Sequence, residues 1–422
     1  MTRARALLVP ALAAWVGACT VAGPRPGGPT GGPGPELPGP PPGGIGAPET
    51  PDVRIGIAVD APAVEVATEG RLELTDDAGV VRDRGAGPWT VTRVNGGVAA
   101  RGPELTVEVD GSLIFRPVRG AIRVNGTGYR GAVLLRPAAS GVTAVNLLDV
   151  ETYLRGVVPL EIGAGRPPEE LEAVKAQAVA ARTYAVRHFG RREDLGFDFH
   201  GTVLDQVYGG ADAEDPVATR AVEETRGVIV TYDGEPIEAF YHSTCGGSTA
   251  ALEEVWNGAP RPYLEAVSDR RPGGGWYCEA SSRFEWTEAW SQAELLAAVT
   301  VGMAGRGVTG VSEVRALEPG GRTPSGRLQA LRVRTDAGEE VVRGDSIRRF
   351  LQPEPGRALN STLIELRHRG GSPVTGLVVE GRGWGHGIGM CQMGALGRAR
   401  AGQSYRDILS TYYPGTRLVR LY

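Results

Sequence analysis

Short apolar runs separated by turn residues fill the chain from residue 53 to about residue 150. The runs are rich in Val, Ile, Leu and Thr, with Gly, Asp, Asn and Pro between them: VRIGIAV, RLELTD, WTVTRV, LTVEV, SLIFRPV, AIRVNG, AVLLRPA and VTAVNLL. Runs of this length and composition are typical of strands joined by tight turns. The pattern predicts a barrel or sandwich of hairpins that serves as a scaffold, since nothing in it has catalytic spacing.

The next stretch, residues 153–189, is different because its apolar positions take a helical period. We expect a short apolar strand, a tight loop that carries Glu161 and then one long helix. Pro167 and Pro168 suit the first turn of that helix, and Gly190 suits its end. Half of the apolar stripe is alanine, so another backbone can pack closely against it. Its members are Leu171, Val174, Ala178, Ala181, Ala185 and Phe189.

Glu161 stands out because it lies in an apolar stretch, from Val157 to Ile162. Burial disfavours the charged form of a carboxyl group, so we expect the pKa of Glu161 to be raised. A carboxyl that stays protonated near neutral pH can act as a general acid. The alternative is an ordinary loop glutamate in contact with solvent.

Beyond the long helix, a second helix is expected at about residues 215–225, followed by a hairpin around Asp233-Gly234. The hairpin brings the segment YHSTCGG, residues 241–247, to the end of a strand, where polar side chains often line a site. His242 in this segment could equally cap a turn or be satisfied in the core. Residues 284–377 mix strand and helix patterns and predict a smaller α+β piece without a catalytic signature.

Glycine alternates with side chains in residues 381–394, GRGWGHGIGMCQMG. An extended chain would place these side chains on one face and bare backbone on the other. Bare backbone invites the close approach of another segment, and the Ala-rich helix is the natural candidate. The other face could meet a ligand, with Trp384 as an apolar platform and His386 as a polar handle. Two short helices, at about residues 391–400 and 405–413, should close the chain.

The N-terminus has the features of a targeting signal. Two arginines precede the apolar segment from Ala6 to Val16, which is too short to span a bilayer, and small residues stand just before Cys19. We expect a lipoprotein signal peptide at residues 1–19 with lipid on Cys19; an ordinary secretory cleavage site is the alternative. Residues 20–52 are almost all Pro and Gly, which predicts a disordered tether. The net charge of −4 gives no reason to expect nucleic acid as a partner.

Three cysteines remain besides Cys19, and disulfides persist in an exported protein. Cys245 and Cys278 are the preferred disulfide pair, which leaves Cys391 free. The alternative is a zinc site made of His242, Cys245 and Cys278, with His386 as a further ligand, although no second close pair completes it. Apart from this alternative, no cofactor is expected.

Six blocks of the chain carry a family resemblance: YLRGVVPLEI, AVKAQAVAARTYA, DQVYGG, FYHSTCGGSTA, GRGWGHGIGMCQMGA and YRDILSTYYPGT. In content and order they resemble the SpoIID/LytB family, from about residue 121 to the end. The resemblance implies an envelope protein that acts on peptidoglycan. One named member of the family is a lytic transglycosylase that cuts glycan strands lacking stem peptides. Another enhances a cell-wall amidase.

The family's catalytic glutamate matches Glu161. This chain departs from the family pattern just after it, at residues 162–164, and in the block GMCQMG, where Cys391 replaces a hydroxyl residue and Met393 an aromatic one. These departures bear on substrate fit rather than on chemistry. The substrate-binding residues expected from the matching blocks are Arg182, Tyr184, Gln206, Tyr208, His242, Ser243, Trp384, His386 and Gln392.

The reaction implied by the resemblance needs one carboxyl. Glu161 would protonate the oxygen between N-acetylmuramic acid and N-acetylglucosamine and then take the proton of the muramic acid 6-hydroxyl, which gives a 1,6-anhydro product. Hydrolysis would need a second carboxylate, for which Asp205 is the one candidate. Two alternatives stay open: a non-catalytic peptidoglycan-binding module that enhances a cell-wall amidase, and a structural lipoprotein that links membrane to wall. The expected partners are peptidoglycan glycan strands, a membrane through lipid on Cys19 and, in the first alternative, the amidase.

These patterns predict an exported α+β protein of the cell envelope, with a β-rich scaffold, a long Ala-rich helix and a smaller inserted α+β domain. The expected parts are a signal peptide (1–19), a tether (20–52), a β-rich domain with the catalytic loop and helix (53–283), a smaller subdomain (284–377), and a glycine-rich strand with C-terminal helices that completes the catalytic domain (378–422).

Overall fold

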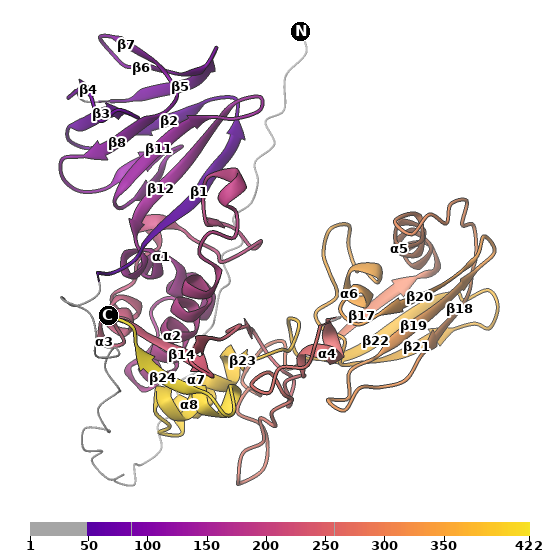
Figure 1. The fold of residues 1–422 in the computed structure, drawn as a ribbon. Helices are drawn as coiled ribbons and strands as arrows, with labels where there is room; N and C mark the ends of the chain where they lie inside the picture. Colours follow the sequence, from indigo (N-terminus) through magenta and orange to yellow (C-terminus); the bar gives the residue numbers. More distant parts are fainter. Residues whose placement is uncertain (1–48, 86, 257) are drawn as a thin grey trace. The chain divides into compact units, whose positions relative to one another are not determined.

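The computed structural model describes residues 49–85, 87–256 and 258–422 (Figure 1). The signal peptide predicted for residues 1–19, with Cys19, and most of the predicted tether lie outside the described residues. Among the helices within these ranges, none is both long enough and apolar enough to cross a membrane.

Residues 52–149 form two sheets, drawn in indigo and purple in Figure 1. Their strands are β1 (Asp52–Ala61), β2 (Val64–Ala67), β3 (Leu72–Asp76), β4 (Val81–Asp83), β5 (Trp89–Val94), β6 (Gly97–Arg101), β7 (Thr106–Asp110), β8 (Leu113–Pro117), β9 (Ile122–Val124), β10 (Thr127–Tyr129), β11 (Ala132–Pro137) and β12 (Val142–Asp149). The strand orders are β1-β12-β11-β8-β3-β4 and β10-β9-β2-β5-β6-β7, and β13 (Phe199–His200) adds to β1 in parallel. Since β5 contacts β11 and β12 of the opposite sheet, the two sheets share one core, as in a sandwich.

Strand β12 leads directly into helix α1 (Val150–Ile162). The side chain of Asp149 caps this helix by accepting from the backbone N–H groups of Glu151 and Thr152. The strand and loop predicted for this stretch are therefore wrong. The Asp149 cap starts a helix, and the apolar positions after it recur every three or four residues. A short 3₁₀ turn, η1 (Pro168–Glu170), then precedes the long helix α2 (Leu171–His188).

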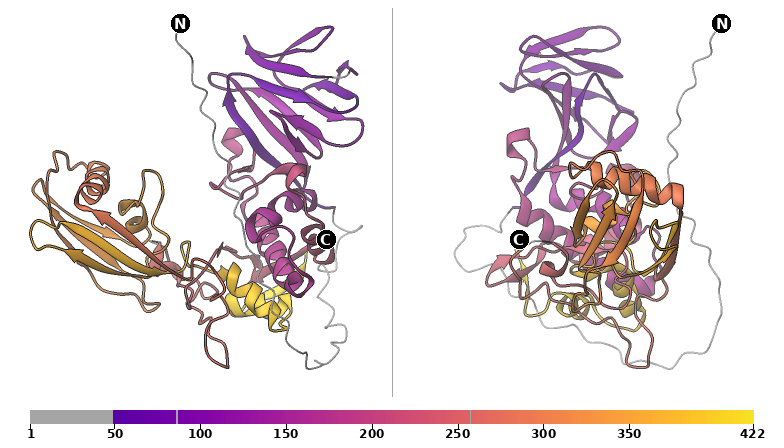
Figure 2. Two further views of the ribbon diagram at one scale, coloured as in Figure 1. Left: turned by 180° about the vertical axis from the view of Figure 1, so that it is seen from behind. Right: turned by 90° about the vertical axis from the view of Figure 1, so that its right-hand side faces the viewer.

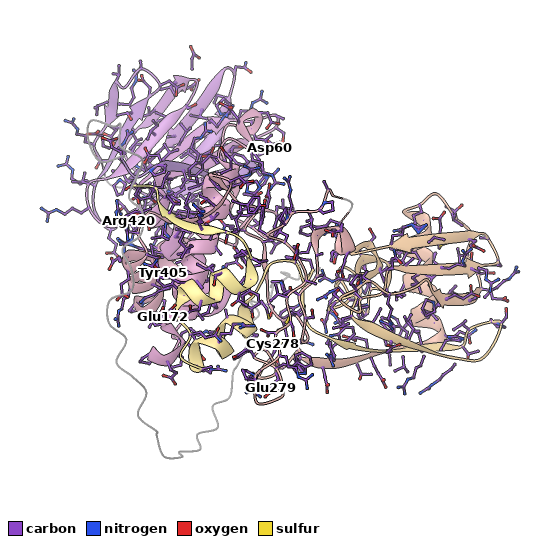
Figure 3. The ribbon with its side chains drawn as sticks, turned by 60° about the horizontal axis from the view of Figure 1, so that its bottom comes forward. Asp60, Glu172, Cys278, Glu279, Tyr405 and Arg420 are labelled. Atoms are coloured by element: carbon purple, nitrogen blue, oxygen red, sulfur yellow. The ribbon has the colours of Figure 1, made fainter. Side chains whose placement is uncertain are left out.

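Helix α2 lies among α1, α3 (Pro216–Glu224), α7 (Gln392–Arg400), α8 (Tyr405–Tyr412) and strand β14 (Val228–Tyr232). Half of its buried positions are alanine, so these elements approach its axis closely. Strand β14 pairs with β15 (Glu235–Pro236) and with the final strand β24 (Arg417–Arg420), which returns the end of the chain to this helix (Figure 2). Figure 3 labels one link in this packing, where the Tyr405 N–H donates to Glu172 Oε2 at 2.8 Å.

Residues 285–382 carry a second apolar core of their own. It is built from two three-stranded sheets, β17-β22-β21 and β18-β19-β20, with helices α5 and α6 packed on them. Side chains such as Trp290, Leu295 and Phe350 fill it. Helix α5 begins at a capping box between Ser291 and Glu294. The bounds are β17 (Glu285–Ser291), α5 (Gln292–Ala304), β18 (Val314–Pro319), β19 (Ala330–Thr335), β20 (Glu339–Arg343), α6 (Ser346–Phe350), β21 (Ile364–Arg369) and β22 (Gly376–Arg382). The chain is thus an α+β protein rich in β structure.

The glycine-rich stretch after β22 is not the extended strand predicted from its alternation. Gly383 and Gly385 have φ values of 82° and 111°, a region that favours glycine. The bare backbone meets the segment 240–245 instead of the Ala-rich helix. A Cβ atom at Gly383 would lie 2.6 Å from the Thr244 carbonyl oxygen, and one at Gly385 would lie 2.8 Å from His242 Cβ. The expected close approach therefore occurs, but with a different partner.

Candidate active site

Glu161 lies in the last turn of α1 rather than in a loop. The backbone N–H of Val207 donates to its Oε1 atom at 3.3 Å, which ties the end of α1 to the segment after β13. Burial raises the pKa of this carboxyl, although hydrogen bonds from Val207, Tyr241 and Gln392 oppose the rise. The site therefore favours a protonated Glu161 more than water does.

Two side chains reach Glu161 from segments far along the chain. Tyr241 belongs to β16 (Tyr241–His242), and Gln392 is the first residue of α7. Strand β16 pairs in parallel with β23 (Met390–Cys391), so Tyr241 lies opposite Met390 and both partners are held at one place. The sequence blocks around residues 241 and 392 thus meet at the carboxyl of Glu161.

A layer of buried polar side chains supports these partners. Gln206 donates from Nε2 to the Tyr241 hydroxyl at 3.0 Å, and its Oε1 accepts from the Tyr153 hydroxyl at 3.3 Å. Gln392 donates to Gln177 Oε1 at 3.2 Å. Gln206 and Gln392 were expected to bind substrate, but both are buried and hold other site residues instead. Tyr153, Tyr241 and Gln177 were missed, although each lies inside one of the six blocks that resemble the family.

The two histidines lie side by side, with ring centroids 5.5 Å apart. His386 donates from Nε2 to the Tyr241 carbonyl at 3.0 Å, and its Nδ1 accepts from the Ile388 N–H at 3.0 Å. Burial lowers its pKa to about 4, so the ring is neutral near pH 7. His242 donates from Nδ1 to the Ile388 carbonyl at 3.1 Å, and its buried Nε2 has no partner among the described residues.

Trp384 is the predicted site residue most open to solvent, with 47% of its surface exposed. Its backbone is fixed by reciprocal hydrogen bonds with Thr244, of 2.7 and 3.0 Å, and the guanidinium of Arg283 lies 5.5 Å from its ring centroid. Ser243, one residue before Thr244, is also partly exposed. An exposed aromatic ring on a fixed backbone suits a sugar face.

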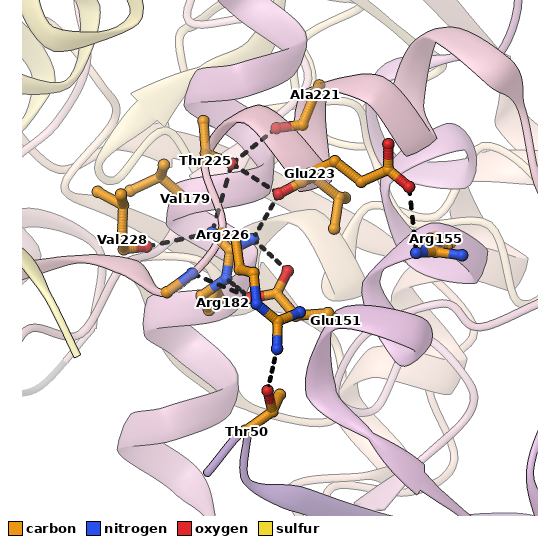
Figure 4. Close-up of polar contacts among 12 residues, drawn as sticks. Thr50, Glu151, Arg155, Val179, Arg182, Ala221, Glu223, Thr225, Arg226 and Val228 are labelled. Atoms are coloured by element: carbon orange, nitrogen blue, oxygen red, sulfur yellow. Dashed lines mark hydrogen bonds and ion pairs between the residues drawn. The ribbon is translucent and has the colours of Figure 1, made fainter. Parts of the chain in front are cut away.

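Arg182 and Tyr208 do not fit the substrate-binding role expected of them. Arg182 is fully buried, and its Nε and NH2 groups donate to Glu151 at 2.8 and 2.7 Å (Figure 4). Tyr208 donates to Asn146 at 2.8 Å from within the core. Tyr184 is also largely buried, and its hydroxyl accepts from Arg191. These side chains stabilise the fold around α2.

Asp205, the sequence candidate for a second carboxylate, is held in ion pairs. Its side chain is inaccessible to solvent, Arg192 Nε lies 2.9 Å from Oδ2, and Arg191 NH1 lies 3.8 Å from Oδ1. It also accepts from the His200 N–H at 2.9 Å. A carboxylate held this way is not free to activate a water molecule.

The cysteines differ from both predicted arrangements. Cys245 and Cys278 are thiols with their sulfurs 3.4 Å apart, so the predicted disulfide is not formed here. Cys391, expected to stand apart, joins them, and the fourth member of the cluster is Asp269. His242 is not part of it, because its ring faces the Ile388 carbonyl. These four residues are the group best placed to hold a metal ion.

A cleft of about 810 Å³ opens elsewhere, beside β17 and β22. Gly246, Trp276, Trp286 and Arg382 are among its lining residues. Neither Glu161 nor any of the nine predicted substrate-binding residues lines it. Since the hydrogen-bonded groups gather around Glu161, we place the candidate active site there and not in this cleft.

Comparisons with known proteins match two parts of the chain to protein families. Residues 138–232, which contain Glu161, match the family described as SpoIID, Stage II sporulation protein, and residues 273–389 match a Domain of unknown function (DUF8618). An uncharacterized protein of Brachyspira hyodysenteriae is 33% identical over 334 residues, which are 78% of this chain and 82% of that protein.

Two relatives from Bacillus subtilis carry functional names. The Amidase enhancer is 33% identical over 299 residues, which are 63% of this chain and 40% of that protein, so the match spans less than half of that relative. Stage II sporulation protein D is 31% identical over 290 residues, which are 65% of this chain and 76% of that protein. This chain belongs to the SpoIID/LytB family of cell-wall proteins.

Proposed function

We propose that this protein is a lytic transglycosylase of the cell envelope that cleaves peptidoglycan glycan strands lacking stem peptides. The observation that carries the proposal is the environment of Glu161. This carboxyl is mostly removed from solvent, its pKa is raised by burial, a backbone N–H donates to it, and the side chains of Tyr241 and Gln392 lie beside it. A glutamate in this state can donate a proton near neutral pH and accept one later.

The reaction follows from this single group. Protonated Glu161 donates to the glycosidic oxygen as the bond from that oxygen to C1 of N-acetylmuramic acid breaks. The 6-hydroxyl oxygen of the same sugar then bonds to C1, and its proton returns to the Glu161 carboxylate. The carboxyl is regenerated, no water is consumed, and the product ends in a 1,6-anhydro sugar.

The state of Asp205 supports this route over hydrolysis. An inverting hydrolase needs a second carboxylate to activate water, and a retaining one needs a carboxylate nucleophile. Asp205 is held by Arg192 and has no exposed surface in its side chain. An internal hydroxyl nucleophile removes the need for either group.

Substrate contacts are assigned to the accessible part of the site. Trp384 offers an exposed ring to a sugar face, and Ser243 offers a partly exposed hydroxyl on the neighbouring segment. Tyr241 and Gln392 lie beside Glu161 and oppose the rise of its pKa that burial causes. The protein would meet this substrate outside the cytoplasm, exported by residues 1–19 and anchored by lipid on Cys19.

The test is digestion of purified glycan strands, with and without stem peptides, with the products read by mass spectrometry. The matched variants are Glu161→Gln and Glu169→Gln, which make the same chemical change eight residues apart. Glu169 is exposed, so its variant should cleave like the wild type. Glu161→Gln should still sediment with the glycan but release no anhydro-terminated fragment. Equal cleavage by both variants would refute the assignment.

One comparison favours a second function. The similarity to the Amidase enhancer suggests a module that binds the glycan and stimulates an amidase without cutting it. In that case the wild type would bind strands and cleave neither substrate, whereas an added cell-wall amidase would release more stem peptide in its presence. Glu161→Gln would then stimulate as well as the wild type.

A further inference from the structure

Four buried side chains outside the active site converge on one point. Cys245 follows β16, Asp269 and Cys278 lie in the loop between α4 (Leu252–Val255) and β17, and Cys391 ends β23. One ligand atom from each lies within 4.8 Å of all the others, and all four residues are buried. Figure 3 labels Cys278 in this region. The geometry points to a structural zinc site with Cys245, Cys278, Cys391 and Asp269 as its ligands.

The distances fit a tetrahedral ion. Zn–S bonds of about 2.3 Å at tetrahedral angles place ligand atoms about 3.8 Å apart. Cys245 Sγ lies 3.4 Å from Cys278 Sγ and 3.6 Å from Asp269 Oδ2. Three thiolates with one carboxylate form a donor set that suits zinc better than calcium or magnesium.

Side chains around the cluster hold Asp269, the fourth ligand. Tyr412 and Arg398 both donate to Asp269 Oδ1, at 2.7 and 3.2 Å, which leaves Oδ2 turned toward Cys245. The Arg398 guanidinium also offsets part of the negative charge of the ligands. A Cβ atom at Gly394 would lie 2.6 Å from Asp269 Oδ2, so only glycine leaves room for this carboxylate. Outer contacts of this kind orient ligands in metal sites.

Backbone groups also hold the sulfur of Cys391. It accepts from the backbone N–H groups of Cys245 and Gly394, both at 3.2 Å, and it caps the N-terminus of α7. These two N–H groups fix the position of the Cys391 sulfur. A disulfide between Cys245 and Cys278 would use neither this sulfur nor Asp269 Oδ2, whereas a metal ion uses all four groups.

The site would fasten the segments that hold Glu161. Cys391 directly precedes Gln392, and Cys245 lies four residues after Tyr241, so the ion would link the segment that follows Tyr241 to the start of α7, where Gln392 lies. Zinc content and thermal stability report on the ion without any glycan. These measurements therefore test the zinc site independently of the proposed reaction.

The experiment uses the full chain with Cys19→Ser, which removes the remaining thiol, purified under reducing conditions. Zinc is quantified by mass spectrometry, and Co²⁺ is titrated as a spectroscopic probe. We expect one zinc ion per chain, a Co²⁺ spectrum with thiolate charge-transfer and tetrahedral bands, and a lower melting temperature after chelation. A reduced chain that binds neither ion overturns the site, as does an isolated chain without zinc that carries a Cys245–Cys278 disulfide.

Variants add a second line of evidence. Changes to outer-shell partners of a metal cost roughly 10–100-fold in affinity. Loss of a ligand in Cys391→Ser should therefore weaken zinc binding by about 100-fold or more, and Asp269→Asn by at least about tenfold. Asp198→Asn is the matched control, because Asp198 is also buried but pairs with Arg54. Zinc affinity that is unchanged in Cys391→Ser contradicts the site.

Discussion

The buried ion pair between Arg182 and Glu151 provides the sharpest stability prediction. Arg182 donates twice to Glu151 and also to the carbonyls of Val222 and Val228, at 3.2 and 3.1 Å (Figure 4). In Arg182→Met the apolar stem stays and the charge disappears. Glu151 would then keep only the Gly227 N–H and the Tyr422 hydroxyl as donors. Breaking one side of a buried pair costs about 3–5 kcal/mol, and we expect that loss in the free energy of unfolding.

A matched control lies nearby in the same figure. Arg155 pairs with Glu223 at 3.2 Å, but 29% and 59% of these side chains are exposed. Arg155→Met should therefore cost no more than about 1 kcal/mol. Urea denaturation followed by far-UV circular dichroism measures both variants. The double variant Arg182→Met with Glu151→Leu should recover most of the loss, because no unpaired charge is left buried.

The dependence on pH gives a further check. In the wild type, burial alone would raise the pKa of Glu151, but the charge and hydrogen bonds of Arg182, together with hydrogen bonds from Tyr422 and Gly227, lower it. This stabilisation is present above the ordinary pKa of glutamate and is lost as the pH falls through the lowered value. Without Arg182 the pKa should rise, so the deficit of Arg182→Met should shrink as the pH falls toward about 4. If Arg182→Met costs no more than Arg155→Met, or binds glycan less tightly without losing stability, the structural role of Arg182 is refuted.

Trp384→Ala should weaken glycan binding by about 0.5–1.5 kcal/mol, or roughly 2- to 12-fold, and leave stability almost unchanged. Val301→Ala, at another exposed apolar position, should change neither quantity in the same sedimentation and melting assays. Gly156→Ala should lower the free energy of unfolding by about 1–3 kcal/mol, because the new Cβ would lie 2.7 Å from the Tyr208 ring. Gly305→Ala is the control: its Cβ has room, so the variant should be neutral or slightly stabilising in urea denaturation. The pKa of His386 is lowered to about 4, so its contribution to stability is present above about pH 6.5 and is lost as the pH falls to about 4. His386→Gln should flatten this part of the plot of unfolding free energy against pH. An unchanged plot would contradict the prediction.

The sequence predicted the elements with strong local signals. The hairpin strands, the Ala-rich helix and the smaller α+β piece carry clear periods and turn residues, and the structure has all of them. The environment of Glu161 was also foreseen, since apolar neighbours in sequence indicated burial. The local sequence pattern predicted the wrong structure where tertiary contacts determine the conformation. Residues 153–162 looked like a strand and a loop because Val and Ile favour strands, yet the cap at Asp149 and the packing on α2 make them helical.

The roles of the site residues also depend on tertiary contacts that the sequence does not show. Arg182 and Tyr208 were expected at the substrate because they stand in family blocks. Both side chains are buried, and a residue in such a block can serve packing as well as ligand contact. Gln206 was expected to bind the glycan, whereas the structure shows it buried and hydrogen-bonded to Tyr153 and Tyr241. The cluster of Cys391 with Cys245 and Cys278 could not be read from spacing, because Cys245 and Cys391 are 146 positions apart and meet through the pairing of β16 with β23. Asp269 has no sequence signal of its own.

The central claim is that Glu161 alone drives cleavage without water. The most direct measurement is digestion of glycan strands in heavy-oxygen water by the wild type and by Glu161→Gln, with product masses recorded over time. We predict that wild-type products are one water lighter than hydrolysis products, contain no heavy oxygen and are absent with Glu161→Gln. Heavy oxygen at the new chain ends, or cleavage that continues in Glu161→Gln, would contradict the claim.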